Sequence, residues 1–278
     1  MAIPGRGPQI PPMLVDVHAH FYHARTPRAD WRERNTSRLR AGDRIGITTH
    51  VASILGTWGQ SSPTYFPSTA DVQTGNDALL GLIHEHRTKI RGYVTVNPNY
   101  TAHALGEITR CLAAGMIGIK LAASRRANDR LLDPVCELAR ERGVPVLHHV
   151  WQHRRRDWPG QEASDAVELV ALARRHPAVA FILAHIGGGG EWGHSLAAVR
   201  DVANVYVDLS GSGVDSGMLE ACVDEVGVER LLWGCDLTMD TGWAKLRYLE
   251  RLLAPGALAQ VQWQNAARIF PRGAFSSD

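Results

Sequence analysis

Short apolar runs alternate with longer amphipathic segments along almost the whole chain. The first run, residues 14–20, ends in His18-Ala19-His20, and further runs follow at 47–54, 91–98, 116–121, 144–149, 178–185, 205–209 and 230–236. These runs are short, rich in apolar and β-branched residues, and bounded by glycine, proline or polar residues, as is typical of buried parallel strands. The pattern therefore predicts eight strands.

Between these runs, apolar residues recur at the three- and four-residue spacing of one helix face. We expect a first helix that ends near Gly42, and further helices at 71–86, 102–114, 131–142, 163–175, 196–202, 217–226, 243–253 and 265–270. Eight strands joined through helices by short connections predict a single (β/α)8 barrel over residues 13–278, after a proline- and glycine-rich tail over residues 1–12. A doubly wound open sheet is the alternative.

Composition narrows the class of protein. The 278 residues exceed a usual domain of roughly 100 to 200, but barrels of about 250 residues form one domain. A net charge of +2 with dispersed basic residues argues against a nucleic-acid partner, and residues 1–12 lack the apolar stretch of a signal peptide or membrane anchor. Four cysteines without a CxxC pair favour a reducing cytoplasm. We expect a small-molecule substrate and leave a homo-oligomer open.

The histidine pair in the first run is the first candidate for chemistry. Successive side chains of a strand point to opposite faces, so His18 and His20 lie on one face, roughly 6 to 7 Å apart along the chain. They end their strand, and the carboxyl ends of barrel strands carry the active site. The pair alone is a weak signal, because a polar strand end gives the same pattern.

Polar residues end three other predicted strands. His148 and His149 end the fifth, His185 the sixth and Asp236 the eighth, so a barrel would gather them at one rim with His18 and His20. Each histidine alone is more often a hydrogen-bonded rim residue. Their joint placement on four strands predicts a metal site, since histidine nitrogen and carboxylate oxygen bind zinc and similar divalent ions.

Five motifs carry a family resemblance: DVHAH at 16–20, PVLHH at 145–149, LAHIGGG at 183–189, LLWGCD at 231–236 and NAARIF at 265–270. They resemble the amidohydrolase superfamily, and within it the amidohydrolase-related branch that includes the aminocarboxymuconate-semialdehyde decarboxylase type. The resemblance implies that His18 and His20 bind the metal, with His149 as third ligand and Asp236 as fourth ligand or water partner. His149 is preferred to His148 because that branch usually has an apolar residue at the position of His148. His185 would hydrogen-bond substrate or water.

Three further residues are candidates for substrate binding. Lys120 ends the fourth strand, where two-metal relatives carry a carboxylated lysine; we favour a rim lysine that pairs with a carboxylate or with substrate. Arg125 follows the same strand and offers a guanidinium for a substrate carboxylate, although a solvated turn is the simpler interpretation. Trp151, with Trp58, Trp158 and Trp192, would line an aromatic pocket or only pack loops together.

The expected activity is hydrolysis of a small-molecule amide, lactone or ester by a water bound to one divalent ion, with zinc expected and manganese or another ion open. Asp236 would take the proton of that water, and His185 would stabilise the oxyanion. The alternative is a metal-dependent decarboxylase of an aromatic or unsaturated acid that uses the same residues. A non-catalytic barrel that binds a ligand is the third interpretation.

Overall fold

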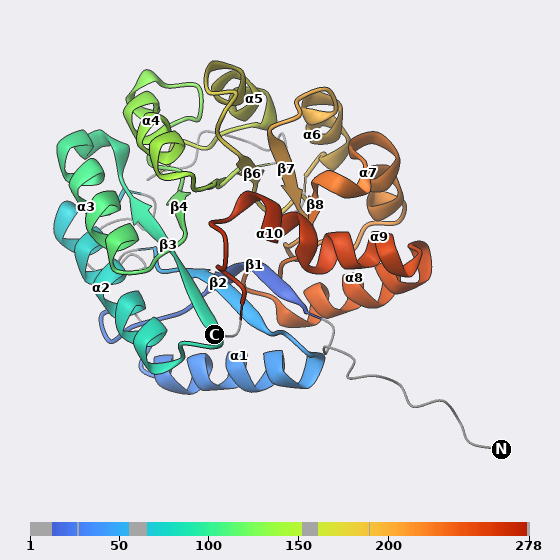
Figure 1. Ribbon diagram of the computed structural model, residues 1–278, viewed down its shortest axis with the longest axis horizontal. Coiled ribbons are helices and arrows are strands. Elements are labelled where there is room, and N and C mark those ends of the chain that lie inside the picture. Colours follow the sequence, from blue (N-terminus) through green and yellow to red (C-terminus); the bar gives the residue numbers. More distant parts are fainter. Residues whose placement is uncertain (1–12, 27, 56–65, 152–160, 189, 277–278) are drawn as a thin grey trace.

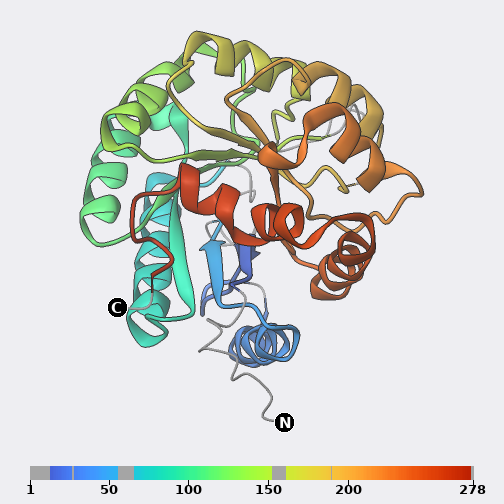
Figure 2. The same ribbon diagram turned by 45° about the vertical axis from the view of Figure 1, so that its right-hand side comes forward.

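Eight parallel strands form a nearly closed barrel surrounded by helices in the computed structural model (Figures 1 and 2), which describes residues 13–26, 28–55, 66–151, 161–188 and 190–276. This confirms the predicted (β/α)8 barrel, while the predicted tail over residues 1–12 lies outside the described residues. Hydrogen bonds join the strands in chain order: β1 (Val15–His20), β2 (Thr49–Ser53), β3 (Ile90–Val96), β4 (Gly118–Leu121), β5 (Val146–His148), β6 (Phe181–Leu183), β7 (Val205–Asp208) and β8 (Leu231–Leu232).

The outer helices lie close to the predicted ranges, but several ends differ. The helix predicted at 243–253 begins four residues earlier, the one predicted at 163–175 begins three residues later, and a short helix at 255–259 was not predicted. The first helix runs past Gly42 to Ile45 and ends at Gly46, whose φ of 89° is the left-handed conformation that favours glycine. The sixth begins at Trp192, four residues before the apolar stripe that predicted it. The helices are α1 (Trp31–Ile45), α2 (Thr69–Glu85), α3 (Thr101–Ala113), α4 (Asp133–Arg142), α5 (Ala166–Arg175), α6 (Trp192–Val199), α7 (Met218–Val226), α8 (Met239–Leu252), α9 (Pro255–Ala259) and α10 (Asn265–Ile269).

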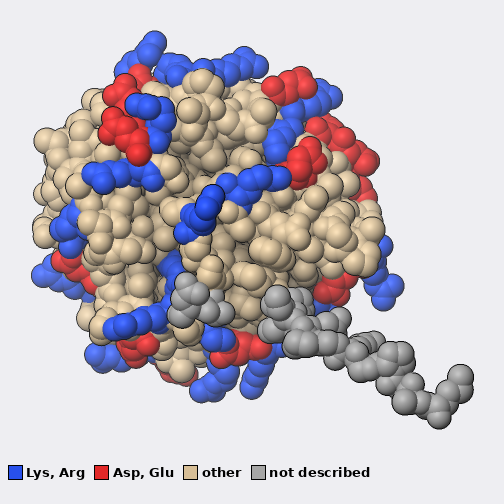
Figure 3. Space-filling model, in the orientation of Figure 1, with Lys and Arg blue, Asp and Glu red and all other residues tan. Residues whose placement is uncertain are grey.

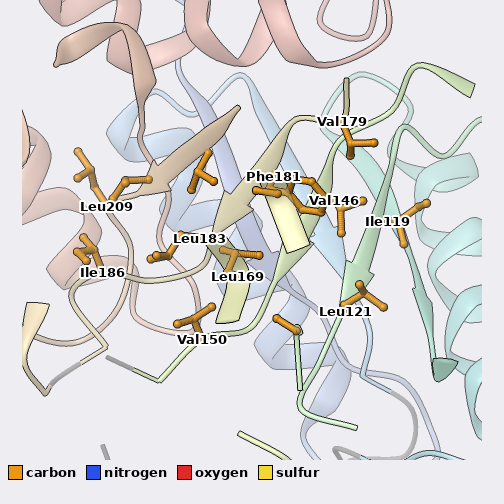
Figure 4. Close-up of a cluster of buried hydrophobic side chains, with 14 of the residues drawn as sticks. Ile119, Leu121, Val146, Val150, Leu169, Val179, Phe181, Leu183, Ile186 and Leu209 are labelled. Carbon is orange, nitrogen blue, oxygen red and sulfur yellow. The ribbon is translucent and has the colours of Figure 1, made fainter. Parts of the chain in front are cut away.

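Strand alternation divides the core into two layers. Outward-facing residues such as Ile119, Phe181 and Leu183 pack between strands and helices, and Figure 4 shows part of this layer. The intervening residues, such as Leu147 and Ile182, fill the barrel interior, where Phe270 also packs. Both layers are buried, so each aliphatic side chain contributes about 1.5 to 3 kcal/mol of hydrophobic stabilisation. This double layer gives the site at the barrel rim a rigid support.

A bulge in β1 sets the direction of the histidine pair. Asp16 pairs with His50 and Ala19 pairs with Ala52, so β1 has one extra residue between the two pairs. A bulge re-aims the side chains that follow it. Val17 therefore lies in the interior cluster, while Ala19 packs in the outer layer and leaves His18 and His20 to the interior.

The surface carries charges of both signs. Basic and acidic side chains are interspersed on the face shown in Figure 3. Within the described part of the chain, no helix is both long and apolar enough to cross a bilayer. The four cysteines are buried and free.

Candidate functional site

Three predicted ligands converge at the carboxyl ends of β1 and β8. The Nε2 atoms of His18 and His20 lie 3.1 Å apart, and Oδ1 of Asp236 lies 3.2 Å from His20 Nε2 and 3.7 Å from His18 Nε2. Their ligand atoms all lie within 4.8 Å of one another. Both histidines are buried, whereas the Asp236 side chain keeps 21% of its surface exposed. The cluster therefore has one side open to an incoming molecule.

Neighbouring acceptors favour the tautomer of each imidazole that carries its proton on Nδ1. His18 Nδ1 donates to Oδ2 of Asp208 at 2.7 Å, and His20 Nδ1 lies 3.2 Å from the carbonyl oxygen of Ser53. With protons on Nδ1, both Nε2 lone pairs face the same space, where they repel one another unless a cation or proton lies between them. Two imidazole lone pairs and a carboxylate are the donor set that zinc and similar divalent ions take, so these residues fit a metal.

Asp208, at the end of β7, is the main support of the site. Its buried Oδ2 accepts hydrogen bonds from His18 Nδ1, from the backbone N–H of His185 at 2.9 Å and from the hydroxyl of Ser210 at 2.6 Å. Burial raises the pKa of Asp208, but these hydrogen bonds outweigh it and the pKa lies below its ordinary value. Sequence reasoning missed this residue, although its place at a strand end was the available signal.

Lys120 lies inside the barrel rather than on an exposed rim. Its side chain is fully buried, and Nζ lies 3.0 Å from Nε2 of His18. Within the described residues Lys120 forms no ion pair with a carboxylate. Of the two partners that we expected, a carboxylate and the substrate, only the substrate remains a prediction. Burial lowers the pKa of Lys120 to about 8. With a pKa of about 8, the Lys120 amine is still mostly protonated at neutral pH and places a positive charge beside His18.

His149 and His185 form a second pair beside the first. Nδ1 of His149 lies 2.9 Å from Nε2 of His185, and the His185 ring stacks on His18 with centroids 5.7 Å apart. His149 does not belong to the compact group of three ligands among the described residues, so its ligand role stays a prediction. Burial lowers the pKa of His185 to about 4, and that of His149 well below its ordinary value. Nδ1 of His185 has no hydrogen-bond partner among the described residues.

Backbone strain coincides with the site. His185 has a φ of 42° and Asp236 a φ of 55°, and among the described residues no other non-glycine residue has a positive φ. Such a conformation costs about 1 to 3 kcal/mol and persists only where surrounding contacts hold it. The Asp208 contact to the N–H of His185 is one such restraint.

Arg125 and Trp151, which the sequence proposed for substrate binding, both contact other side chains of the protein. Arg125 pairs with Glu162 at 3.3 Å and with Asp129 at 3.5 Å, so its guanidinium already has carboxylate partners. Trp151 packs edge-on against His149 with ring centroids 4.8 Å apart, which places an aromatic ring at the site. Trp192 packs against the outer core layer, and Trp58 and Trp158 lie outside the described residues.

A cavity of about 270 Å³ borders the candidate site at His20. It lies between α1 and residues 237–239, and its wall includes His20, Tyr22, Arg38 and Met239.

The comparisons with known proteins agree with this architecture. An amidohydrolase family model matches residues 15–272, and no curated protein sequence matches the chain. Many solved structures are similar to it, and three of them illustrate the likeness. The first is a 2,6-dihydroxybenzoate decarboxylase from Rhizobium, with 17% identity and a TM-score of 0.71 over 92% of this chain and 98% of that chain. The second is a dihydroxybenzoic acid decarboxylase from Polaromonas with bound manganese and the inhibitor 2-nitroresorcinol, with 18% identity and a TM-score of 0.69 over 92% of this chain and 96% of that chain. The third is a 4-oxalomesaconate hydratase from Rhodopseudomonas palustris, with 18% identity and a TM-score of 0.65 over 94% of this chain and 96% of that chain. At these identities the similarity establishes the fold.

Proposed function

The chain belongs to the amidohydrolase family, and on that premise we propose that it is a metal-dependent decarboxylase of a small aromatic or unsaturated acid. The sequence favoured hydrolysis and kept decarboxylation as the alternative. The observation that reverses this order is the likeness, over more than nine-tenths of both chains, to two dihydroxybenzoate decarboxylases, one of them with bound manganese. Hydrolysis of an amide, lactone or ester is the second candidate.

His18, His20 and Asp236 would hold one divalent ion, with His149 as a further ligand from the neighbouring pair. The ion, manganese or zinc, supplies positive charge that binds substrate oxygens and stabilises negative charge as it develops. Asp208 keeps the Nε2 lone pair of His18 directed at that position.

Asp236 is the candidate proton carrier. Burial raises its pKa, but the nearby His18 and His20 outweigh that effect and hold the pKa well below its usual value, so the group is a carboxylate in the free protein. A carboxylate can accept the proton of a substrate hydroxyl and return it to the ring carbon that carries the departing carboxylate. The electron pair of the broken carbon–carbon bond stays with the ring as carbon dioxide leaves, and the resulting phenolate takes a proton from water.

His185 and Lys120 would orient the substrate. His185 Nδ1 lies beside the ligand cluster and is free to hydrogen-bond a substrate oxygen. The buried Lys120 adds positive charge beside His18, which favours an acid as substrate over a neutral molecule. Trp151, against His149, offers an aromatic surface for stacking.

Ionised Asp236 also suits the removal of a proton from water, and this feature favours hydrolysis as the second candidate. The mixed surface charge supports a small-molecule substrate rather than a nucleic acid, and the free, buried cysteines support a cytoplasmic location.

A substrate panel separates the two activities. The protein, loaded with Mn²⁺ or Zn²⁺, is incubated with hydroxybenzoic and unsaturated acids and with lactones, esters and amides, and products and carbon dioxide are quantified. We expect carbon dioxide release from at least one acid and a loss of about 100-fold or more in Asp236→Asn. Hydrolysis of a lactone, ester or amide, with no carbon dioxide released from any acid, would contradict the decarboxylase proposal and support the hydrolase.

A further inference from the structure

The edge between β8 and β1 carries two of the site's segments but little regular strand pairing. β8 has only two residues, Leu231–Leu232, and Ala19 and Asp236 form an isolated bridge beyond it. Two backbone hydrogen bonds cross this edge, from Val17 N to Trp233 O at 3.1 Å and from Asp236 N to His18 O at 2.7 Å. Asp236 lies past the end of β8 and is joined to β1 by this single bridge, so a side chain from outside the sheet can add to what holds it.

Arg38 on α1 provides such a contact. Its guanidinium donates from Nη1 to the carbonyl oxygen of Asp236 at 2.6 Å and from Nη2 to Oδ2 of Asp16 at 2.9 Å. The Arg38 side chain is only 8% exposed, and Asp16 is fully buried. A charge-assisted pair shielded from water in this way is stronger and more directional than a surface ion pair.

Asp16 extends the connection to both ligand segments. Its Oδ1 accepts from the backbone N–H of Cys235 at 2.9 Å and from that of His18 at 3.2 Å. Oδ2 also accepts from Nδ1 of His50 at 2.9 Å. Arg38 and Asp16 together therefore join α1, the His18 backbone and the residues on both sides of the Cys235–Asp236 peptide bond.

This connection acts on the strained residue. Asp236 has a φ of 55°, and both of its backbone polar groups are engaged, the N–H with His18 and the carbonyl oxygen with Arg38. Loss of the guanidinium would leave that carbonyl oxygen without its charged donor. The backbone could then relax toward negative φ and turn the carboxylate away from His18 and His20.

We infer that Arg38 is a positioning residue, which holds the Asp236 carboxylate in its metal-binding geometry through the Asp236 carbonyl oxygen and Asp16. The inference rests on the metal site proposed above. The competing view is that Arg38 only fastens α1 to the barrel. The two differ in what they predict for metal affinity when the protein stays folded.

Metal-free protein is titrated with Mn²⁺ by calorimetry, and the melting of each metal-free variant is followed by circular dichroism. Arg38→Met should weaken Mn²⁺ binding about 10- to 100-fold, as the loss of a contact that orients a ligand does elsewhere. Arg40→Met, an exposed arginine of the same helix, should leave the affinity unchanged. Leu39→Ala removes an apolar contact between α1 and the outer core layer and leaves Asp16, His50 and Asp236 unaltered, so it should lower the melting temperature while changing Mn²⁺ affinity less than about twofold.

Arg38→Lys tests the geometry if Arg38→Met does not fold. An ammonium group lacks the fork that reaches both acceptors, so we expect about tenfold weaker Mn²⁺ binding with the fold retained. Folded Arg38 variants with wild-type affinity, or equal losses of affinity in Arg38→Met and Leu39→Ala, would overturn the inference. Wild-type protein that binds no Mn²⁺ or Zn²⁺ would instead refute the metal site itself.

Discussion

Asp208 determines how His18 can act, because a single carboxylate oxygen holds one imidazole nitrogen and leaves the other directed at the site. The same oxygen binds the N–H of the strained His185, so the two histidine segments share one support. Chemistry at this rim thus depends on residues that contact no substrate.

Replacing Asp208 tests that dependence. In Asp208→Asn the acceptor of His18 Nδ1 loses its charge, so the preference for the Nε2 lone pair weakens and divalent-ion affinity should fall about 10- to 100-fold. Ser210→Ala removes one hydroxyl that donates to the same carboxylate and should have a much smaller effect. Titration of both metal-free variants with Zn²⁺ gives the comparison. Equal affinities for Asp208→Asn and the wild type would contradict the assigned role.

Buried histidines also predict how stability depends on pH. Burial lowers the pKa of His20, His148 and His185 to about 4 in the folded state, against an ordinary value near 6.5. The unfolded chain therefore binds more protons than the folded chain between pH 6.5 and 4. The contribution of these histidines to the free energy of unfolding is fully present above pH 6.5 and is lost as the pH falls toward 4. The melting temperature of metal-free protein should drop steadily across this window. A constant melting temperature from pH 7 to 5 would show that these histidines are not buried as neutral groups.

At the scale of single residues, sequence reasoning brought together His18, His20 and Asp236 because histidine pairs and strand ends are visible in a sequence. It did not identify Asp208, Asp16 or Arg38. Their importance follows from contacts between residues far apart in the chain, such as Arg38 with Asp236, and no local pattern encodes these contacts.

Two elements set the geometry of the site, the bulged strand β1 and the helix α1 that packs outside it. Alternation alone would place Asp16, His18 and His20 on one face. The bulge separates them, so that His18 and His20 face the interior while Asp16 meets Arg38 and His50. A bulge adds a single residue to a regular pattern and therefore leaves little trace in the sequence.

The packing of α1 depends on a glycine that the sequence suggested as the helix end. A Cβ at Gly42 would lie 2.5 Å from Nε2 of His50, so Gly42→Ala forces a shift in a packed contact and should destabilise the fold by about 1 to 3 kcal/mol. Gly81 is exposed inside α2 with open space around it, and Gly81→Ala should stabilise the fold by about 0.5 to 1 kcal/mol. Chemical denaturation of both variants tests the pair. Equal effects on the free energy of unfolding would contradict this packing.

For the whole molecule, the alternating pattern was sufficient to predict the barrel, because eight apolar runs separated by amphipathic segments fit few other architectures. The alternation of apolar runs and amphipathic segments does not indicate which reaction occurs, since a barrel rim with two histidines and an aspartate is compatible with both hydrolysis and decarboxylation. The similarity to solved decarboxylase structures, at 17% and 18% identity over 92% of this chain, shows the fold, and the order of the two candidate reactions stays our proposal. The buried Lys120 beside His18 gives that order a physical basis in an acidic substrate.

The central claim is that one divalent ion, held by His18, His20 and Asp236, makes the protein a decarboxylase. The most direct test is the rate of carbon dioxide release from an acid substrate as Mn²⁺ is added stepwise to metal-free protein. We expect no release without metal and a rise that levels off at one equivalent per chain. Release that is unaffected by complete removal of metal, or that requires two equivalents, would contradict it.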